Sequence, residues 1–173
     1  MELVIDLGNT TCRVYFFDGY QIRAMGTIPS GGTSFEKYMK AWCRWARQWG
    51  VTSSTVVSVV PVLEDFVKSL IEAENLGLFW IKQGRIKGVP SEIPRDMGPD
   101  RIANLAGAIA FFDQPTIVVD LGTALTVDAI DRRGHYLGGV IFPGPDTVAA
   151  SLKANTACLP QLGWLGLSQP KSA

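Results

Sequence analysis

The feature that most constrains this chain is a pattern that occurs twice: an apolar strand followed by Asp-Leu-Gly and small polar residues. The first copy places Asp6 and Gly8 after an apolar run, and the second places Asp120 and Gly122 in the same way. A glycine in such a turn lets backbone N–H groups approach a ligand, so the turn suits phosphate oxygens or a phosphate-bound cation. Either copy alone is also compatible with an ordinary strand exit. Because the two copies have matching flanks, we expect an internal repeat whose turns bind opposite sides of one polyphosphate.

Both copies continue into an alternating strand and a hairpin. Asp18-Gly19 marks the hairpin of the first copy, and the cluster at 131–134 marks that of the second. The uninterrupted β-branched run at 116–119 is typical of a strand that is buried on both faces. Each repeat is therefore predicted to begin as a three-stranded antiparallel sheet.

Helical periodicity follows the first three strands. Apolar residues at helical spacing predict a helix over 34–49, with Thr33 and Glu36 in capping-box spacing and with Trp42, Trp45 and Trp49 on the core side. Further patterns predict a strand at 55–60, a helix at 62–75, a strand at 78–81 and a helix at 100–112. The first repeat is thus expected to be β-β-β-α-β-α-β-α.

The second repeat begins in the same way and then stops. Strands are expected near 116–120, 124–130 and 135–142, followed by a helix at about 146–154. No further strand or helix is expected after that. We therefore expect an α/β protein with one complete domain at 1–113 and a partial second domain at 114–173.

Composition excludes several classes of function. Lys plus Arg number 16 and Asp plus Glu number 16, so no net charge draws the chain to nucleic acid, and no apolar run is long enough to cross a membrane. We expect a cytoplasmic protein. Cys12, Cys43 and Cys158 lack metal-ligand spacing and are expected to be buried thiols. His135 is the single histidine, so we do not expect catalysis by a histidine general base.

A second chemically distinctive turn is Gly98-Pro99-Asp100-Arg101, which precedes the helix at 100–112. Asp100 is a candidate N-cap of that helix. The functional alternative is that Asp100 accepts a proton from a substrate hydroxyl while Arg101 holds a carboxylate or phosphate. Spacing alone does not decide between these two roles.

Five short motifs, taken together, resemble the type III pantothenate kinases in order and spacing, from residue 1 to about 160. They are Asp6-x-Gly8-Asn9-Thr10, Ser58-Val-Val-Pro61, Gly98-x-Asp100-Arg101, Asp120-x-Gly122-Thr123-Ala124-x-Thr126 and Gly138-Gly139-x-Ile141-x-Pro143-Gly144, with Leu159-Pro160 after them. The resemblance implies duplicated ribonuclease H-like domains of the actin-like ATPase type, with the second copy incomplete. It also implies transfer of the γ-phosphoryl of ATP to the primary hydroxyl of pantothenate, the first step of coenzyme A biosynthesis.

Residue roles follow from the resemblance, position by position. It implies that Asp100 is the catalytic proton acceptor and that Gly98, Pro99, Asp100 and Arg101 bind pantothenate. It implies a homodimer with ATP, Mg²⁺ and a monovalent cation, K⁺ or NH₄⁺, the last bound by Asp120. The residues implied to bind ATP are Asp6, Leu7, Gly8, Asn9, Thr10, Thr11, Cys12, Arg13 and Thr123.

Two departures from the family pattern leave other functions open. Ser91 stands where many relatives carry a tyrosine that touches pantothenate, and relatives continue beyond Ala173. One alternative is a non-catalytic regulatory or accessory factor that keeps the nucleotide fold. Another is a sugar or acetate kinase of the same superfamily, which the Gly-Pro-Asp-Arg turn disfavours.

Overall fold

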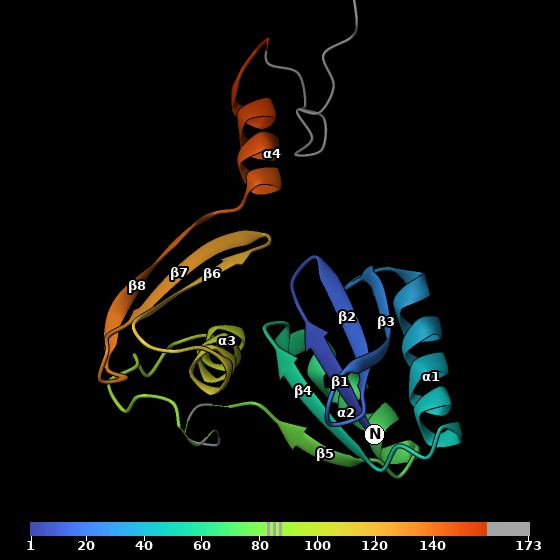
Figure 1. Ribbon diagram of the computed structural model, residues 1–173. Helices are drawn as coiled ribbons and strands as arrows, with labels where there is room; N and C mark the ends of the chain where they lie inside the picture. The colour runs from blue at the N-terminus through green and yellow to red at the C-terminus, as the bar shows by residue number, and fades with distance from the viewer. Residues whose placement is uncertain (83, 85, 87, 159–173) are drawn as a thin grey trace, which may run out of the picture. The chain divides into compact units, whose positions relative to one another are not determined.

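The computed structural model describes residues 1–82, 84, 86 and 88–158, and the chain forms two compact units (Figure 1). The first unit contains Met1–Val89 and Pro94–Ala106, and the second contains Pro90–Ile93 and continues from Gly107. The elements are β1 (Glu2–Leu7), β2 (Thr11–Phe17), β3 (Ile22–Pro29), α1 (Thr33–Gln48), β4 (Ser53–Ser58), α2 (Pro61–Ala73), β5 (Gly77–Trp80), α3 (Pro99–Phe111), β6 (Thr116–Leu121), β7 (Ala124–Ile130), β8 (Tyr136–Pro143) and α4 (Pro145–Asn155). This order confirms the expected repeat. The domain boundary after residue 113 stays a prediction.

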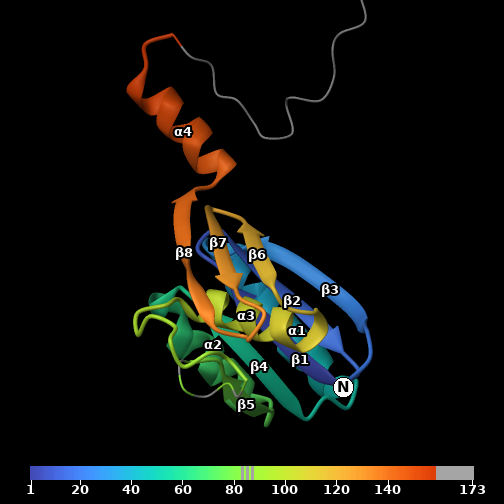
Figure 2. The same cartoon turned by 60° about the vertical axis from the view of Figure 1, so that its left-hand side comes forward.

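The first unit is built on a five-stranded sheet with the order β3-β2-β1-β4-β5 (Figures 1 and 2). β1 pairs antiparallel with β2 and parallel with β4, and β5 extends the parallel part. In the parallel register Leu7 lies opposite Ser58, so β1 and β4 end at the same edge of the sheet. The turn that begins at Gly8 and the Ser58–Pro61 motif are therefore neighbours.

One face of this sheet forms the core of the first unit. Leu3, Ile5 and Leu7 alternate with half-buried residues along β1, and none of the three is exposed. α1 packs on β1 and β3, α2 packs on β4 and β5, and the two helices contact each other, so both cover the same face. The buried residues they contribute are Phe35, Met39, Trp42, Cys43, Ala46, Val67 and Ile71.

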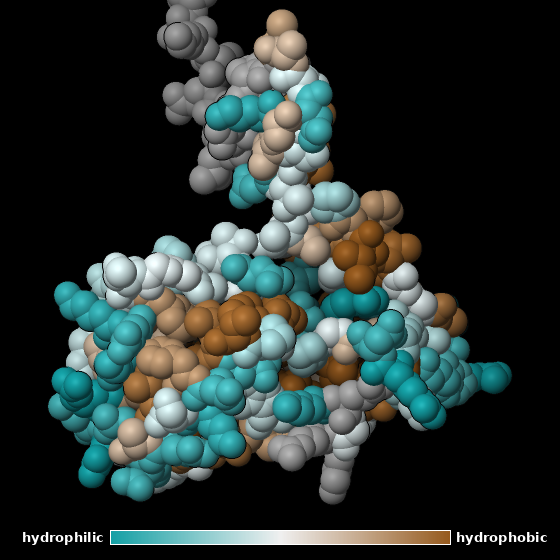
Figure 3. Space-filling model, turned by 180° about the vertical axis from the view of Figure 1, so that it is seen from behind, coloured by the Kyte–Doolittle hydropathy of each residue, from teal (hydrophilic) through white to brown (hydrophobic). Residues whose placement is uncertain are grey.

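The second unit contains a three-stranded antiparallel sheet with the order β6-β7-β8. Cross-strand register places eight apolar residues on one side of it, here called the apolar face of the second sheet. They are Ile117, Val119, Leu121, Leu125, Val127, Ala129, Val140 and Phe142. Ile117 is 69% exposed and Val119 is 60% exposed. Hydrophobic side chains are accordingly visible at the surface of the molecule in Figure 3.

The expectation that the run at 116–119 is buried on both faces is therefore wrong. β6 alternates between half-buried and exposed residues. No residue of α4 is buried, and its Val148 and Leu152 are each 42% exposed. Among the described residues, no helix covers this face as α1 and α2 cover the first sheet.

Three local expectations were also wrong. α1 has Gly32 at its N-cap with no side-chain hydrogen bond, so Thr33 and Glu36 do not form a capping box. Trp42 is buried, but Trp45 and Trp49 are about half exposed. The buried residues of α1 are Phe35, Met39, Trp42, Cys43 and Ala46. Cys158 is exposed, whereas Cys12 and Cys43 are buried.

The equivalent leucines of the two repeats provide a test of this difference. Leu7 is completely buried and Leu121 is 50% exposed. We expect Leu7→Ala to lower the free energy of unfolding by about 2–5 kcal/mol, the usual cost of a core cavity. Leu121→Ala should cost less than about 1 kcal/mol, because half of its side chain already contacts water. Urea denaturation followed by circular dichroism measures both values, and equal losses would show that the apolar face of the second sheet is covered in solution.

Candidate functional site

The first turn joins β1 to β2 and is held by its own backbone. The Gly8 N–H donates to the Thr11 carbonyl at 3.1 Å, and a Cβ on Gly8 would lie 3.0 Å from that oxygen. The Ser30 N–H donates to the Thr10 carbonyl at 3.0 Å, which fixes the turn against the end of β3. Asn9 and Thr10 are exposed, so the tip is accessible to a ligand.

Asp6 precedes this turn on the face of the sheet away from the core. Its Oδ2 accepts from the Arg13 guanidinium at 3.1 Å, and the two residues are direct cross-strand neighbours. The Asp6 and Arg13 side chains are 32% and 43% exposed. The pair therefore offers a carboxylate and a guanidinium to the same half-open surface.

Two members of the expected ATP-binding segment point the other way. Leu7 and Cys12 are completely buried in the core. Burial raises the pKa of the Cys12 thiol to about 12, and the negative charge of Asp6 adds to the shift. Any contact of these two residues with a ligand is therefore limited to their backbone, while Asn9, Thr10 and Arg13 have accessible side chains.

The second turn joins β6 to β7 and is locked to the start of α4. The Thr123 carbonyl accepts from the Gly144 N–H at 2.8 Å and from the Thr147 hydroxyl at 2.7 Å. A Cβ on Gly144 would lie 1.9 Å from the Gly122 carbonyl oxygen, so only glycine permits this approach. The contact gives a steric reason for the glycine that closes the 138–144 motif.

Asp120 is the residue before the last of β6 and lies on the side of the second sheet that is opposite its apolar face. Its direct cross-strand neighbour is Thr126, which is buried. Asp128, two residues further along β7, is 2% exposed and accepts a hydrogen bond from the Tyr136 hydroxyl at 2.8 Å. The structure thus brings two carboxylates and two hydroxyl residues to this side of the sheet, and the sequence analysis had not identified Asp128 or Tyr136.

The Gly98-Pro99-Asp100-Arg101 turn forms the start of α3. The Ile102 N–H donates to the Gly98 carbonyl at 3.1 Å and Pro99 is the first helical residue, so Asp100 lies in the first turn and is not the N-cap. The interpretation of Asp100 as the N-cap is therefore wrong, because Pro99 already occupies the first helical position. Asp100 Oδ1 accepts from the Arg101 N–H at 2.8 Å, and a Cβ on Gly98 would lie 2.5 Å from this oxygen.

A pocket of about 390 Å³ lies beside this turn and entirely within the first unit. Here called the acceptor pocket, it has an apolar wall with a polar residue at the end of β4. Residues that line it include Ser58, Val59, Pro61, Met97, Pro99 and Ile102. The pocket therefore lies outside the carboxyl ends of parallel strands, where α/β folds commonly bind ligands.

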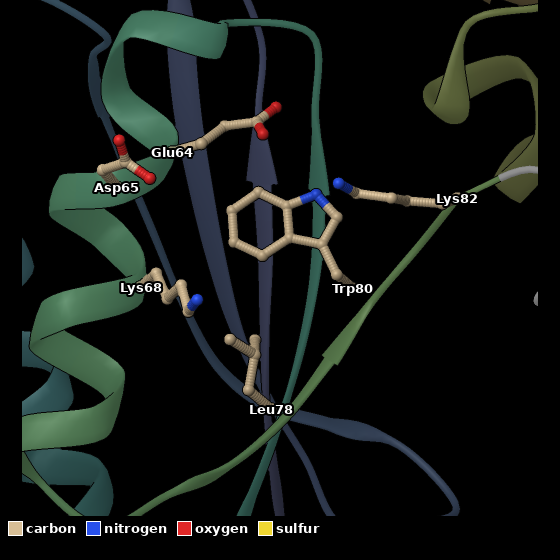
Figure 4. Close-up of a pocket in the computed structure, with 6 residues that line it drawn as sticks. All are labelled: Glu64, Asp65, Lys68, Leu78, Trp80 and Lys82. Carbon is tan, nitrogen blue, oxygen red and sulfur yellow. The ribbon is translucent and has the colours of Figure 1, made fainter.

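An outer groove of about 290 Å³ adjoins the acceptor pocket. In Figure 4, Glu64, Asp65 and Lys68 on α2 face Trp80 and the strand that carries it. Lys82 also lines the groove, and Glu64, Trp80 and Lys82 line both spaces. The two spaces therefore share a wall.

Ser30 is a further polar residue that the sequence analysis had not identified. Its hydroxyl oxygen is buried and has no hydrogen-bond partner among the described residues, although its N–H holds the first turn. No cluster of three or more His, Cys, Asp or Glu side chains occurs in the described part of the chain. The candidate cation ligands are instead single carboxylates with nearby hydroxyl groups, which are the hard oxygen donors that magnesium and alkali cations prefer.

Comparison with solved structures identifies the class of fold. The ethanolamine utilization protein EutJ from Carboxydothermus hydrogenoformans superposes with a TM-score of 0.51 at 12% identity, over 88% of this chain and 55% of that one. The activator of the 2-hydroxyisocaproyl-CoA dehydratase from Clostridium difficile, solved with bound ADPNP, superposes with a TM-score of 0.50 at 13% identity, over 90% of this chain and 53% of that one. The fold is that of the actin-like ATPases, as the family resemblance implied.

Sequence comparison then identifies the family. The type III pantothenate kinase family profile matches residues 2–172. The type III pantothenate kinase of Persephonella marina is 33% identical over 94% of this chain and 67% of its own length, and that of Moorella thermoacetica is 34% identical with the same coverages. The protein from Methylacidiphilum infernorum is 30% identical, and 56% of its length is covered. The chain belongs to the type III pantothenate kinases, a family of kinases, and spans between about half and two thirds of these relatives.

The cysteine environments predict an ordered reactivity. The thiolate is the reactive form, and burial raises the pKa of Cys12 and of Cys43 to about 12, whereas Cys158 is exposed. We expect a disulfide reagent at pH 8 to modify Cys158 rapidly and the other two thiols only when urea unfolds the first unit. Ellman titration of the native chain and of Cys158→Ser measures this. Rapid modification of Cys12 in the variant would contradict the sealed core described above.

Proposed function

We propose that this chain transfers the γ-phosphoryl group of ATP to the primary hydroxyl of pantothenate, the first step of coenzyme A biosynthesis. The observation that carries the proposal is the acceptor pocket beside Asp100, in a chain that belongs to this kinase family. Its apolar wall suits the dimethyl-substituted carbon of pantothenate. Ser58 and the start of α3 supply the polar end.

ATP would be bound by the two equivalent turns. We assign Asp6, Gly8, Asn9, Thr10, Thr11 and Arg13 to the phosphates, with backbone contributions from Leu7 and Cys12, and Thr123 to the nucleotide from the second turn. The accessible tip of the first turn supports this assignment. The related activator fold with bound ADPNP supports nucleotide binding by this architecture.

Asp100 would be the proton acceptor, with Gly98, Pro99 and Arg101 binding pantothenate around it. Asp100 lies in the first turn of α3, and Pro99 lines the acceptor pocket. A carboxylate at this place can take the proton of a hydroxyl that attacks phosphorus. The Arg101 guanidinium supplies positive charge for anionic groups of either substrate.

Magnesium would be bound by Asp6 together with the ATP phosphates, and a monovalent cation, K⁺ or NH₄⁺, by Asp120. The charge of Asp6 is shared with Arg13, whereas the cross-strand neighbour of Asp120 is the neutral Thr126. Hydroxyl and carboxylate oxygens around a large cation form a suitable donor set. When bound, magnesium neutralises the charge of the transferred phosphoryl group.

We also propose domains at 1–113 and 114–173, a homodimer, and a cytoplasmic location with no nucleic-acid or membrane partner. The helices of the described residues are all too short or too polar to cross a membrane. The alternative function is that of a non-catalytic regulatory or accessory factor. It keeps nucleotide binding and lacks turnover.

A coupled ADP-release assay separates these possibilities. The purified chain is supplied with ATP, magnesium and potassium, and with pantothenate, a sugar or acetate in turn. Pantothenate-dependent ADP release supports the proposal, and release with a sugar or acetate alone identifies a different kinase. ATP binding by calorimetry without turnover on any acceptor supports the accessory role.

Replacement of Asp100 by asparagine tests its chemical role. Asp100→Asn preserves the size of the side chain but removes the proton acceptor, so turnover should fall by about 10²–10⁴-fold. This corresponds to roughly 3–5 kcal/mol in the barrier. The Kd for ATP should be unchanged. Initial rates at saturating ATP and calorimetric titration measure the two effects.

Two matched variants accompany this experiment. Glu36→Gln removes an acid from the first turn of α1 and controls for the loss of a helix-terminal charge. In Gly98→Ala the new methyl group would lie 2.5 Å from Asp100 Oδ1 and would displace this carboxylate, so turnover should also fall. No backbone atom lies close to the methyl group, so the backbone can keep its position. If Asp100→Asn retains most of its turnover, Asp100 is only a helix-terminal charge.

The Asp120 assignment predicts a requirement for a large monovalent cation. Rates at fixed magnesium and ATP should be highest in K⁺ or NH₄⁺ and should fall when Na⁺ or Li⁺ replaces them, because the smaller ions hold their water more strongly. Asp120→Asn should lower the rate in potassium to the lithium level. Full activity of the unmodified chain in a buffer that contains only lithium would contradict the assignment.

A further inference from the structure

The acceptor pocket and the outer groove share one cationic side chain, that of Lys82. Its Nζ lies 6.0 Å from the centre of the Trp80 ring, within the range of a cation–π interaction. Figure 4 shows the ammonium group of Lys82 beside the indole of Trp80. Within the described part of the chain, Lys82 forms no ion pair, whereas the other lysine of the groove, Lys68, lies 3.9 Å from Glu72.

The remaining charges of these spaces limit what can bind there. Glu64 lines both spaces, and Asp65 and Lys68 line the groove. Two carboxylates beside two ammonium groups give no net positive charge, so a polyphosphate would be repelled by the acids as much as it is attracted. A ligand with a single carboxylate at the end of an uncharged body needs only one cationic partner, and Lys82 is the cationic residue that lines both spaces.

The acceptor pocket supplies the surface for such an uncharged body. Val59, Met97 and Ile102 form its apolar wall between the start of α3 and Trp80. Pantothenate has a primary hydroxyl at one end, a dimethyl carbon and an amide in the middle, and a carboxylate at the other end. Pro99 and Lys82 both line this pocket, so a ligand with its hydroxyl toward Asp100 can place its other end toward Lys82.

We propose that Lys82 binds the carboxylate of the phosphoryl acceptor, with the Trp80 ring holding the ammonium group in place. This inference rests on the proposed function and adds the residue that selects an acidic acceptor over a neutral one. A hydrogen bond between charged groups is stronger than one between neutral groups, so the carboxylate gains affinity that an amide does not. Lys82 acts on binding and takes no part in the transfer of the phosphoryl group.

The test compares two acceptors and three proteins. The acceptors are pantothenate and its primary amide, which has the same shape without the charge. The proteins are the unmodified chain, Lys82→Gln, and Lys37→Gln, which removes an exposed lysine from α1 away from both spaces. KM for each acceptor, KM for ATP and kcat are measured by ADP release, and circular dichroism verifies that each variant is folded.

We expect the unmodified chain to prefer pantothenate to the amide by about tenfold in kcat/KM. Lys82→Gln should raise KM for pantothenate about tenfold, leave kcat and KM for ATP unchanged, and remove the preference, while Lys37→Gln keeps it. An equal loss for both acceptors, or no loss for either, overturns the role of Lys82. If the unmodified chain phosphorylates neither acceptor, the proposed function fails, and calorimetric binding of the two compounds to the same proteins still decides whether Lys82 selects the carboxylate.

Discussion

The burial of one face of the first sheet against α1 and α2 is the constraint on which the rest of the structure depends. Leu3, Ile5 and Leu7 are completely removed from water on this face. Since strand side chains alternate, their burial places Asp6 on the opposite face, where it meets its cross-strand neighbour Arg13. A shift of the strand register by one residue would bury the Asp6 carboxylate and expose Leu3 and Leu7. The same register therefore determines both the core and the position of the first turn.

Features that depend on local periodicity could be predicted from the sequence. The alternation along β1, the helical spacing in α1 and the repeated Asp-Leu-Gly pattern gave the correct order of elements. The Gly98–Arg101 turn was also found at the start of a helix. The position of Asp100 within that helix was wrong by a small register shift, because Pro99 and not Asp100 begins the helical turn. Helix ends depend on single backbone torsion angles, which periodicity does not determine.

Features that depend on distant segments could not be predicted. β1 and β6 have similar apolar sequences, yet Leu7 is buried and Leu121 is half exposed, because burial depends on which helices cover the strand. Trp80 and Lys82 carry no motif, and their importance arises only when β5, α2 and the start of α3 enclose a common space. The buried Asp128 and the half-buried Tyr136 lie on different strands and are joined by a hydrogen bond. A sequence pattern shows which side chains share a strand face, but not what lies above that face.

The close contact of Gly144 with the second turn joins that turn rigidly to the start of α4. The backbone of Gly144, with φ −69° and ψ 167°, is open to any residue, so glycine is required for space and not for conformational freedom. α4 has 11 residues, none of them buried, and Thr123 holds its first turn. α4 is about 16 Å long, so a rotation at its anchored end moves its far end over a larger distance. A small torsional change at Thr123 therefore displaces Asn155 far more than it displaces the turn itself.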